Sequence, residues 1–402
     1  NVAGDFFVGD DLTLLSDASV LGFGADTDTT LTHVADTGIL LNSTRQLQFG
    51  DSGTYIHQSA DGVLDLVSDT ELELNATTID MNGNLDLSGT LNGISILADA
   101  TNFTDSILIS QNASTGTLDA ATNNTGLGDT VFAALTSGDN NVGIGADSLK
   151  ALTTGSGNVG VGFAALEANT TADNNTAIGF TALLVNTTGA DNTAIGSGAL
   201  DANTTASNNT AIGKDSLGAN TTGTGLTAVG KNSLTANTTG NLNVAMGGSA
   251  LASNTTGTQN TGIGVNALNA NTTASDNTAI GLNSLLSNTT GASNTAVGSG
   301  ALDANTTASE NTAMGHNSLS ANTTGAENTA IGQNALLTNT TGSFNVSVGK
   351  SSLASNTTAS ENTAVGKNAL GSNTTGGLNT GIGATALSSN TTGQYNTAVG
   401  GQ

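Results

Sequence analysis

The 402-residue chain contains no cysteine, no proline and no tryptophan, and very few of its residues are basic. The lack of cysteine excludes a disulfide framework, a thiolate nucleophile and a cysteine-ligated metal. Six Lys and Arg against 31 Asp and Glu leave a formal net charge of −25. A chain of this charge does not bind nucleic acid or an anionic membrane through a basic surface.

Long apolar runs are also missing. No run approaches the roughly 18 residues of a membrane-spanning helix, and no basic-then-apolar leader opens the chain. We therefore expect no membrane insertion and no signal peptide in this stretch. The first residue is Asn1 rather than Met, so we expect the chain to be processed or cut from something longer.

Charged residues make up 9% of the chain and aromatic residues 3%, whereas an ordinary globular protein has about 25% charged residues. The bulk consists of Gly, Ala, Asn, Thr, Ser, Leu, Ile and Val. Such a composition indicates either disorder or a repeat array in which each residue stacks on its own copy. The periodicity of the sequence decides between the two.

From Asn124 onward the sequence repeats every 17 residues without an insertion. Sixteen complete units end at Tyr395, and a partial seventeenth stops at Gln402, so we expect the natural protein to continue. The unit reads N-T-A-I-G-x-x-[A/S]-L-x-x-N-T-T-[G/A]-x-x, and we number its residues positions 1 to 17. Position 5 is Gly in all 17 copies, position 9 is Leu in 15 of 16, and position 12 is Asn in 14 of 16. Disordered low-complexity sequence does not hold such a register.

A 17-residue unit is too short for a helical pair or a leucine-rich repeat, and it suits one coil of a parallel β-solenoid. Positions 2 to 4 alternate as a strand does, and Gly at position 5 permits a bend with positive φ. The [A/S]-L pair at positions 8 and 9 predicts a second, shorter strand. The Asn-Thr-Thr-Gly stretch predicts a turn in which Asn adopts the left-handed region. A helical conformation of 130–135 or 145–152 is an alternative.

Stacked coils place the same position of successive units in one column, about 4.8 Å apart. A charged column would repel itself, so acidic residues such as Asp191, Asp201, Glu310 and Glu327 occur only where the unit varies. Columns of Asn can pass amide hydrogen bonds from coil to coil. Sixteen coils would form a rod of roughly 77 Å. Each coil buries little and depends on its neighbours, and the recurrent Ala at positions 3 and 8 would offer a small-residue face for oligomerisation.

Residues 1–123 differ from the array at 124–402, and we predict that they form a β-rich acidic N-terminal segment. They hold 18 of the 31 acidic residues and only one basic residue, Arg45. Apolar and polar residues alternate over short stretches separated by Gly-containing turn signals. The predicted strands include Leu64–Leu66, Glu71–Ala76, Ile79–Met81 and Leu85–Leu87.

The N-T-A-I-G-x-x-A-L units of 124–402 resemble the head repeats of trimeric autotransporter adhesins, whose unit contains S-V-A-I-G. They are even more similar to the N-T-A-I-G-x-x-[A/S]-L-x-x-N-T-T-G arrays of phage tail fibre proteins. The stretch Leu47–Leu66 resembles segments of virion structural proteins of marine phages. The resemblance implies a left-handed parallel β-roll assembled as a parallel, intertwined homotrimer. The 17-residue unit is longer than the usual adhesin-head unit.

The histidines are scattered as His33, His57 and His316, and no catalytic triad follows from them. His316 occupies the variable position 6, and His57 follows the strand-like Tyr55-Ile56. The stretch Asp80–Asp86 has oxygen ligands at alternate positions, as a calcium loop has. Its Gly is misplaced and no Glu closes it, so a plain turn is favoured.

Three recurrent motifs have a structural interpretation beside a functional one. Gly-Ile-Gly at 143–145 lacks the third glycine and the βαβ context of a dinucleotide site. Asn-Thr-Thr, present 14 times from Asn169 to Asn390, is a glycosylation sequon, but a column of Asn explains it without sugar. Regular Thr ranks on a β-solenoid can bind ice, but simple polar turns are the favoured explanation of them.

The sequence thus predicts an all-β structural protein, the shaft of a trimeric phage tail fibre that supports host attachment. One alternative is a bacterial trimeric surface adhesin, and another is a monomeric ice- or glycan-binding β-solenoid. The expected partners are the chain itself, other virion or tail proteins, and a host receptor contacted by a tip outside this chain. The expected location is the virion or, alternatively, the bacterial surface. We predict no enzymatic activity and no catalytic, cofactor-binding or metal-ligating residue.

Overall fold

A computed structural model of the chain describes residues 115–401 without a gap. Before them it describes 9–10, 13, 15, 20–23, 29–34, 38–41, 47–48, 55–57, 65–67, 90–91, 94–100 and 103–110. The chain divides into two compact units, Asn1–Asp86 and Leu87–Gln402. Within the described ranges all regular elements are strands, so the fold is all-β, and no helix there is long and apolar enough to cross a membrane.

The first unit contains two small antiparallel sheets. They are β1 (Val20–Phe23), β2 (Thr29–Val34) and β3 (Gly38–Leu41), and β4 (Leu47–Gln48), β5 (Tyr55–His57) and β6 (Asp65–Val67). Strand β6 overlaps the predicted strand at Leu64–Leu66, and the expectation of short strands in this segment is confirmed. The predicted strands at Glu71–Ala76, Ile79–Met81 and Leu85–Leu87 lie outside the described residues.

The second unit opens with three antiparallel strands that join the repeat array. These are β7 (Thr90–Leu91), β8 (Ile94–Ala100) and β9 (Phe103–Ser110). Strand β9 then pairs in parallel with both β10 (Ala121–Thr122) and β11 (Thr125–Leu127). The compact unit therefore begins before the 17-residue period does, because β9 is hydrogen-bonded to the first coil.

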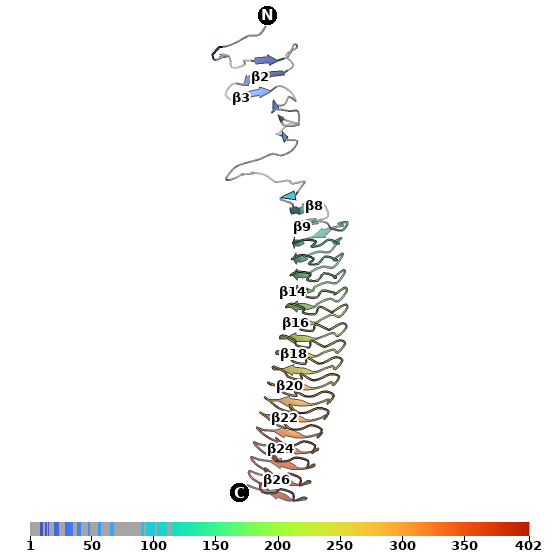
Figure 1. Cartoon of the computed structure of the whole chain (residues 1–402), viewed down its shortest axis with the longest axis vertical. Helices are drawn as coiled ribbons and strands as arrows, with labels where there is room; N and C mark the ends of the chain where they lie inside the picture. Colours follow the sequence, from blue (N-terminus) through green and yellow to red (C-terminus); the bar gives the residue numbers. More distant parts are fainter. Residues whose placement is uncertain are drawn as a thin grey trace. The chain divides into compact units, whose positions relative to one another are not determined.

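From β11 onward the second unit is a parallel β-solenoid of 17-residue coils, as predicted, and each coil contains one strand (Figure 1). Each strand pairs in parallel with the next, and equivalent positions lie side by side, as in Ala177 beside Ala194. The remaining strands are β12 (Val142–Ile144), β13 (Val159–Val161), β14 (Thr176–Ile178), β15 (Thr193–Ile195), β16 (Thr210–Ile212), β17 (Thr227–Val229), β18 (Val244–Met246), β19 (Thr261–Ile263), β20 (Thr278–Ile280), β21 (Thr295–Val297), β22 (Thr312–Met314), β23 (Thr329–Ile331), β24 (Val346–Val348), β25 (Thr363–Val365), β26 (Thr380–Ile382) and β27 (Thr397–Val399).

The predicted second strand at positions 8 and 9 is wrong. The residues at positions 7 and 9 have positive φ throughout, for example Leu183 with φ 51° and Leu353 with φ 45°, and a left-handed residue interrupts an extended strand. The backbone still bonds to the next coil, because the N–H of Leu183 donates to the carbonyl of Ala199 at 3.0 Å. The same left-handed residues exclude the helical alternative at 130–135 and 145–152, where the chain forms turns and bends and contains no helix.

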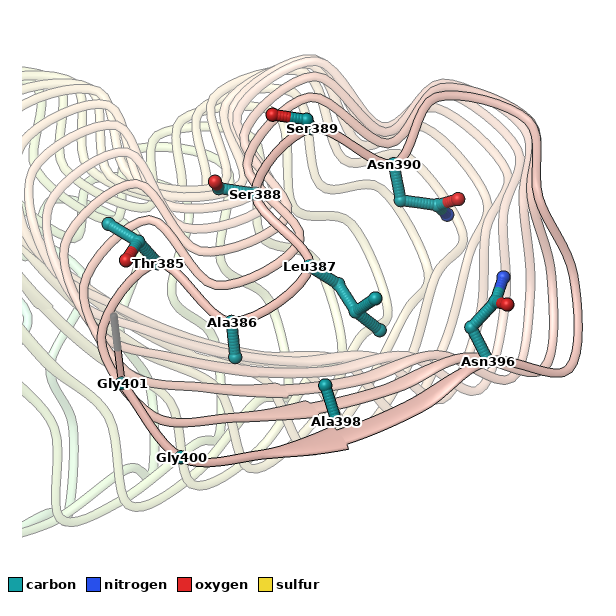
Figure 2. A pocket seen from close by; sticks show the side chains of 10 residues that line it. All are labelled: Thr385, Ala386, Leu387, Ser388, Ser389, Asn390, Asn396, Ala398, Gly400 and Gly401. Carbon is teal, nitrogen blue, oxygen red and sulfur yellow. The ribbon is translucent and has the colours of Figure 1, made fainter.

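The interior of the coil is filled by the small residues at positions 3 and 8 and by Leu at position 9. Figure 2 shows Ala386, Leu387 and Ala398 pointing into the last coil from its two sides. In the coils before it, Ala177, Ala182 and Leu183 are completely buried. The recurrent Ala therefore does not form an outer face, and the expectation that it offers one for oligomerisation is wrong. Two sides of a coil this thin approach closely, and only small residues fit between them.

Glycine at position 5 is required by two independent features. Its φ lies between 120° and 144° in every copy, a region that residues with a Cβ rarely adopt. A Cβ at Gly179 would also lie 2.5 Å from the carbonyl oxygen of Gly196 in the next coil. The predicted bend with positive φ is confirmed, and close stacking of the coils adds a steric reason to the conformational one.

Two columns of buried Asn run through the array, at positions 1 and 12. Asn192 Nδ2 donates to Asn175 Oδ1 of the previous coil at 3.1 Å, and Asn203 Nδ2 donates to Asn186 Oδ1 at 2.8 Å. Both Asn192 and Asn203 also donate to the carbonyl of Ala206, so one carbonyl ties the columns together. The predicted amide ladders are confirmed. The left-handed turn residues, however, lie at positions 7, 9 and 17 rather than at the Asn of position 12.

Candidate interaction surface

The outer face of the strands carries an uncovered row of aliphatic side chains. Position 3 points inward, whereas positions 2 and 4 point outward because side chains alternate along a strand. Ile178 is 40% exposed while its neighbour Ala177 is completely buried. The most exposed members of the row at position 4 are Leu127, Ile144, Ile178, Ile212, Met246, Ile280, Met314, Ile331, Val365, Ile382 and Val399. We call positions 2 and 4 of β11 to β27 the strand face.

No residue at positions 1 to 5 is charged in any of the 17 units. Apolar residues also extend the strand face at position 6, where Phe163 and Phe180 stack with ring centroids 5.4 Å apart. Val265 and Leu282, at the same position of later coils, are each about half exposed. Soluble monomers rarely expose continuous apolar patches beyond a few hundred Å², which makes this strip the candidate interaction surface of the array.

Most charged residues of the array border the strand face, and the others lie at positions 7 and 10. Position 6 follows the strand, and its charged or titratable residues are Asp129, Lys214, Lys231, His316, Lys350 and Lys367. Positions 16 and 17 precede the strand of the next unit, and their charged residues are Asp139, Asp173, Asp191, Asp276, Glu310, Glu327 and Glu361. The face is thus bounded by a mainly basic edge and an acidic edge.

The coil carries its threonine pairs away from the strand, at positions 13 and 14. The position-13 hydroxyl donates to the position-13 carbonyl of the next coil, as in Thr187 to Thr204 at 3.0 Å. The position-14 side chains are exposed, from Thr154 to Thr392. Their hydroxyls make no hydrogen bond within the described part of the chain. One threonine of each pair therefore holds adjacent coils together, and the other forms a regular exposed row.

The Asn-Thr-Thr sequons place their Asn inside the coil. Asn186 and Asn254 are completely buried, and the Nδ2 of each donates to the previous Asn and to the carbonyl at position 15. A glycan attached to Nδ2 would remove one of these hydrogen bonds and has no space in the stack. The structural interpretation of the repeated sequon is therefore the one that the geometry supports.

Hydrogen bonds and burial shift the pKa values of Asp147, Lys150 and Asp201. A hydrogen bond from the Thr130 hydroxyl, joined by one from Lys150 at 2.9 Å, lowers the pKa of Asp147. The same contact with Asp147 raises the pKa of Lys150. Burial raises the pKa of Asp201 at position 10, with a smaller contribution from the nearby Asp215. Thr130 and Asp147 belong to neighbouring coils, as do Asp201 and Asp215, whereas Lys150 and Asp147 belong to the same coil.

The three histidines lie in different elements of the chain. His316 is exposed at position 6, and His33 and His57 lie in β2 and β5 of the first unit. The stretch Asp80–Asp86 lies outside the described residues. In the Gly-Ile-Gly motif at 143–145, Gly143 lies in β12, and Gly145 forms the position-5 bend that follows this strand. Among the residues that the structure describes, no group of three or more acidic residues or histidines is arranged to hold a metal ion.

A cavity of about 540 Å³ lies at the end face of the stack (Figure 2). It is lined by Leu387, Asn390, Asn396 and Ala398, which continue the interior columns of the preceding coils. Figure 2 shows the amides of Asn390 and Asn396 directed toward each other across the coil. The lining therefore consists of the coil interior and adds no separate binding group.

Comparison with known protein families, with curated proteins and with solved structures gives no match to this chain.

Proposed function

We propose that the chain is the structural shaft of a fibre, formed by copies that associate through the strand face. The observation that carries the proposal is the charge-free aliphatic row at position 4 on the outside of every strand of the array. A single coil needs apolar residues only inside, so an apolar outer row has a use only when another surface covers it. The resemblance to tail fibre and adhesin repeats favours a parallel homotrimer.

The role of such a shaft is mechanical. Interlocked backbone hydrogen bonds between coils give a stack with length and stiffness, and the acidic surface opposes nonspecific aggregation. We propose a phage tail fibre that extends toward the host and supports attachment through a tip outside this chain. A bacterial surface adhesin is the alternative with the same physical basis.

The test is the solution mass of the full chain by light scattering, over a range of dilution. The shaft proposal expects three times the monomer mass. The variant Ile263→Lys/Ile280→Lys places two charges on the strand face and is expected to give a monomer, because burying unpaired ammonium groups at an interface is unfavourable. The control Thr273→Lys/Thr290→Lys, on the exposed threonine row, is expected to keep the mass. A parent chain that stays monomeric at all concentrations overturns the proposal.

The exposed threonine row supports a second candidate, a solenoid that binds ice. Fifteen position-14 threonines, from Thr154 to Thr392, lie in register at the coil spacing, and their hydroxyls are open to water. Thermal hysteresis of the freezing point tests this function directly. Replacement of alternate position-14 threonines by Lys would abolish a genuine activity, and the absence of hysteresis in the parent chain would exclude it.

A further inference from the structure

The two edges of the strand face carry opposite charge. Beside the strand, position 6 holds the exposed Lys214, Lys231, Lys350 and Lys367. On the other side, position 17 holds the exposed Asp191, Asp276, Glu310, Glu327 and Glu361. Four of the five lysines of the array thus line one edge, and acidic residues line the other.

Most of these edge charges have no ionic partner within the described part of the chain. Lys214 pairs with the adjacent Asp215 at 2.7 Å. The other ion pairs found there join Lys150 at position 10 to Asp147 and Glu167. Lys231, Lys350 and Lys367 are therefore left with exposed ammonium groups at the border of an apolar face. This is the arrangement expected at the rim of an interface, where charges fix orientation more than affinity.

The symmetry of an assembly decides which edges meet. When identical chains run in the same direction around a rotation axis parallel to the stack, the position-6 edge of each copy faces the position-17 edge of the next. When two chains run in opposite directions face to face, edges of the same kind meet. Only the first arrangement brings the basic edge of one copy to the acidic edge of another.

We propose that neighbouring copies meet edge to edge in this way, with position 6 of one copy beside position 17 of the next at the same level of the stack. Strand β25 (Thr363–Val365) has both partners at its ends, so Lys367 of one copy faces Glu361 of the next. Strand β22 (Thr312–Met314) repeats the arrangement with His316 and Glu310. This inference rests on the proposed self-association and adds its direction, its register and the residues that set them.

Chemical cross-linking tests the arrangement, because the chain has no cysteine of its own. On the two sides of β21 (Thr295–Val297), the full-length single variants Ser299→Cys and Ser293→Cys mark positions 6 and 17. After unfolding and refolding together, the mixture of the two is expected to cross-link with a short bismaleimide, whereas each variant alone is not. The control Thr290→Cys, on the threonine row, should cross-link with neither.

The inference would be overturned if Ser299→Cys alone cross-linked as strongly as the mixture, or if the chain formed an oligomer in which the mixture did not cross-link at all. Both outcomes leave the proposed shaft intact. A monomeric parent chain would instead overturn the shaft and this inference together, and light scattering of the parent distinguishes that case.

Charge reversal provides a second measurement. Lys367→Glu or Glu361→Lys alone is expected to weaken association about two- to fivefold at low salt, as exposed ion pairs do. The double variant Lys367→Glu/Glu361→Lys should restore it, because each interface then regains one charge of each sign. High salt should reduce the effect of both single variants. Failure of the double variant to recover association would contradict the pairing.

Discussion

The inner and outer faces of the same strands are both free of charge, but they differ in what covers them. The inner residue at position 3 is completely buried, as in Ala279, whereas the outer Ile280 is 38% exposed. The inner face is required for a coil to close, since its two sides must pack. The outer face is not required for closure, and it nevertheless excludes charge in every unit. The difference separates the residues that make the coil from those available for contact with another surface.

The largest expected effect comes from breaking the contact between coils at position 5. Gly247→Ala should destabilise its coil by about 3 kcal/mol or more, because φ is 136° and the new Cβ would lie 2.5 Å from the Gly264 carbonyl oxygen. Urea unfolding followed by circular dichroism measures the loss. The adjacent Gly248→Ala is the matched control, since its Cβ meets nothing within 4 Å. Equal losses for the two variants would contradict the steric argument.

The interior and the outer face of the coil can be compared by replacing one buried amide and one exposed aliphatic residue. Asn271→Ala should cost about 2–4 kcal/mol, because it leaves Asn254 Oδ1 without its donor and Asn288 Nδ2 without one acceptor. Ile280→Ala should cost less than about 1 kcal/mol in a dissociated chain. The same substitution should cost more in an associated chain, where another copy covers the strand face. Unfolding at two protein concentrations separates the cases, and a concentration-independent cost for Ile280→Ala would argue against a covered face.

A natural interruption of the position-1 column predicts a smaller, stabilising change. Leu226 replaces Asn in one coil, and among the described residues the backbone N–H of Asn243 then has no acceptor. Leu226→Asn restores an Oδ1 there and is expected to raise the unfolding free energy by about 1 kcal/mol.

Leu135→Asn is the contrasting variant. It places an amide at position 12 below Leu152, where no Asn of the next coil can donate to it, and it should lower the unfolding free energy by about 1–3 kcal/mol. Differential scanning calorimetry of both variants measures the difference. If both substitutions stabilised the chain, its stability would depend on the number of buried amides and not on an unbroken column of Asn.

The smallest effect concerns the two coils that share the sequence Ser-Gly-Ala-Leu-Asp, at 197–201 and 299–303. Burial raises the pKa of Asp201, whereas Asp303 accepts a hydrogen bond from the Ser320 hydroxyl at 2.7 Å. Asp201→Asn is expected to stabilise by about 0.5 kcal/mol or less at neutral pH, and Asp303→Asn is not.

The sign of the pH dependence follows from the direction of the Asp201 shift. A carboxyl whose folded pKa is raised opposes folding above that pKa, and the cost disappears as the pH falls through it. The advantage of Asp201→Asn should therefore shrink on acidification through the raised pKa. Thermal unfolding at several pH values checks this, and an advantage that grows at low pH would be inconsistent with the burial of Asp201.

Much of the coil could be predicted from particular residues. The strand at positions 2 to 4, the positive-φ glycine at position 5 and the amide ladders all follow from recurrence in a 17-residue register. Position 9 could not be predicted, because Leu in a left-handed conformation is uncommon and no local signal announces it. Its conformation is imposed by packing, which turns the Leu183 side chain into the interior of a narrow coil.

The sequence by itself determined the period, the neutral columns, the exclusion of charge from positions 1 to 5 and the all-β class. These features follow from the repetition, because each residue lies beside its own copy in the next coil and must be able to pack against it. The tertiary structure decided which apolar residues lie inside. Ala at positions 3 and 8 fills the interior because the two sides of the coil lie too close for larger side chains. Ile and Val at position 4 consequently remain outside, where only another surface can bury them.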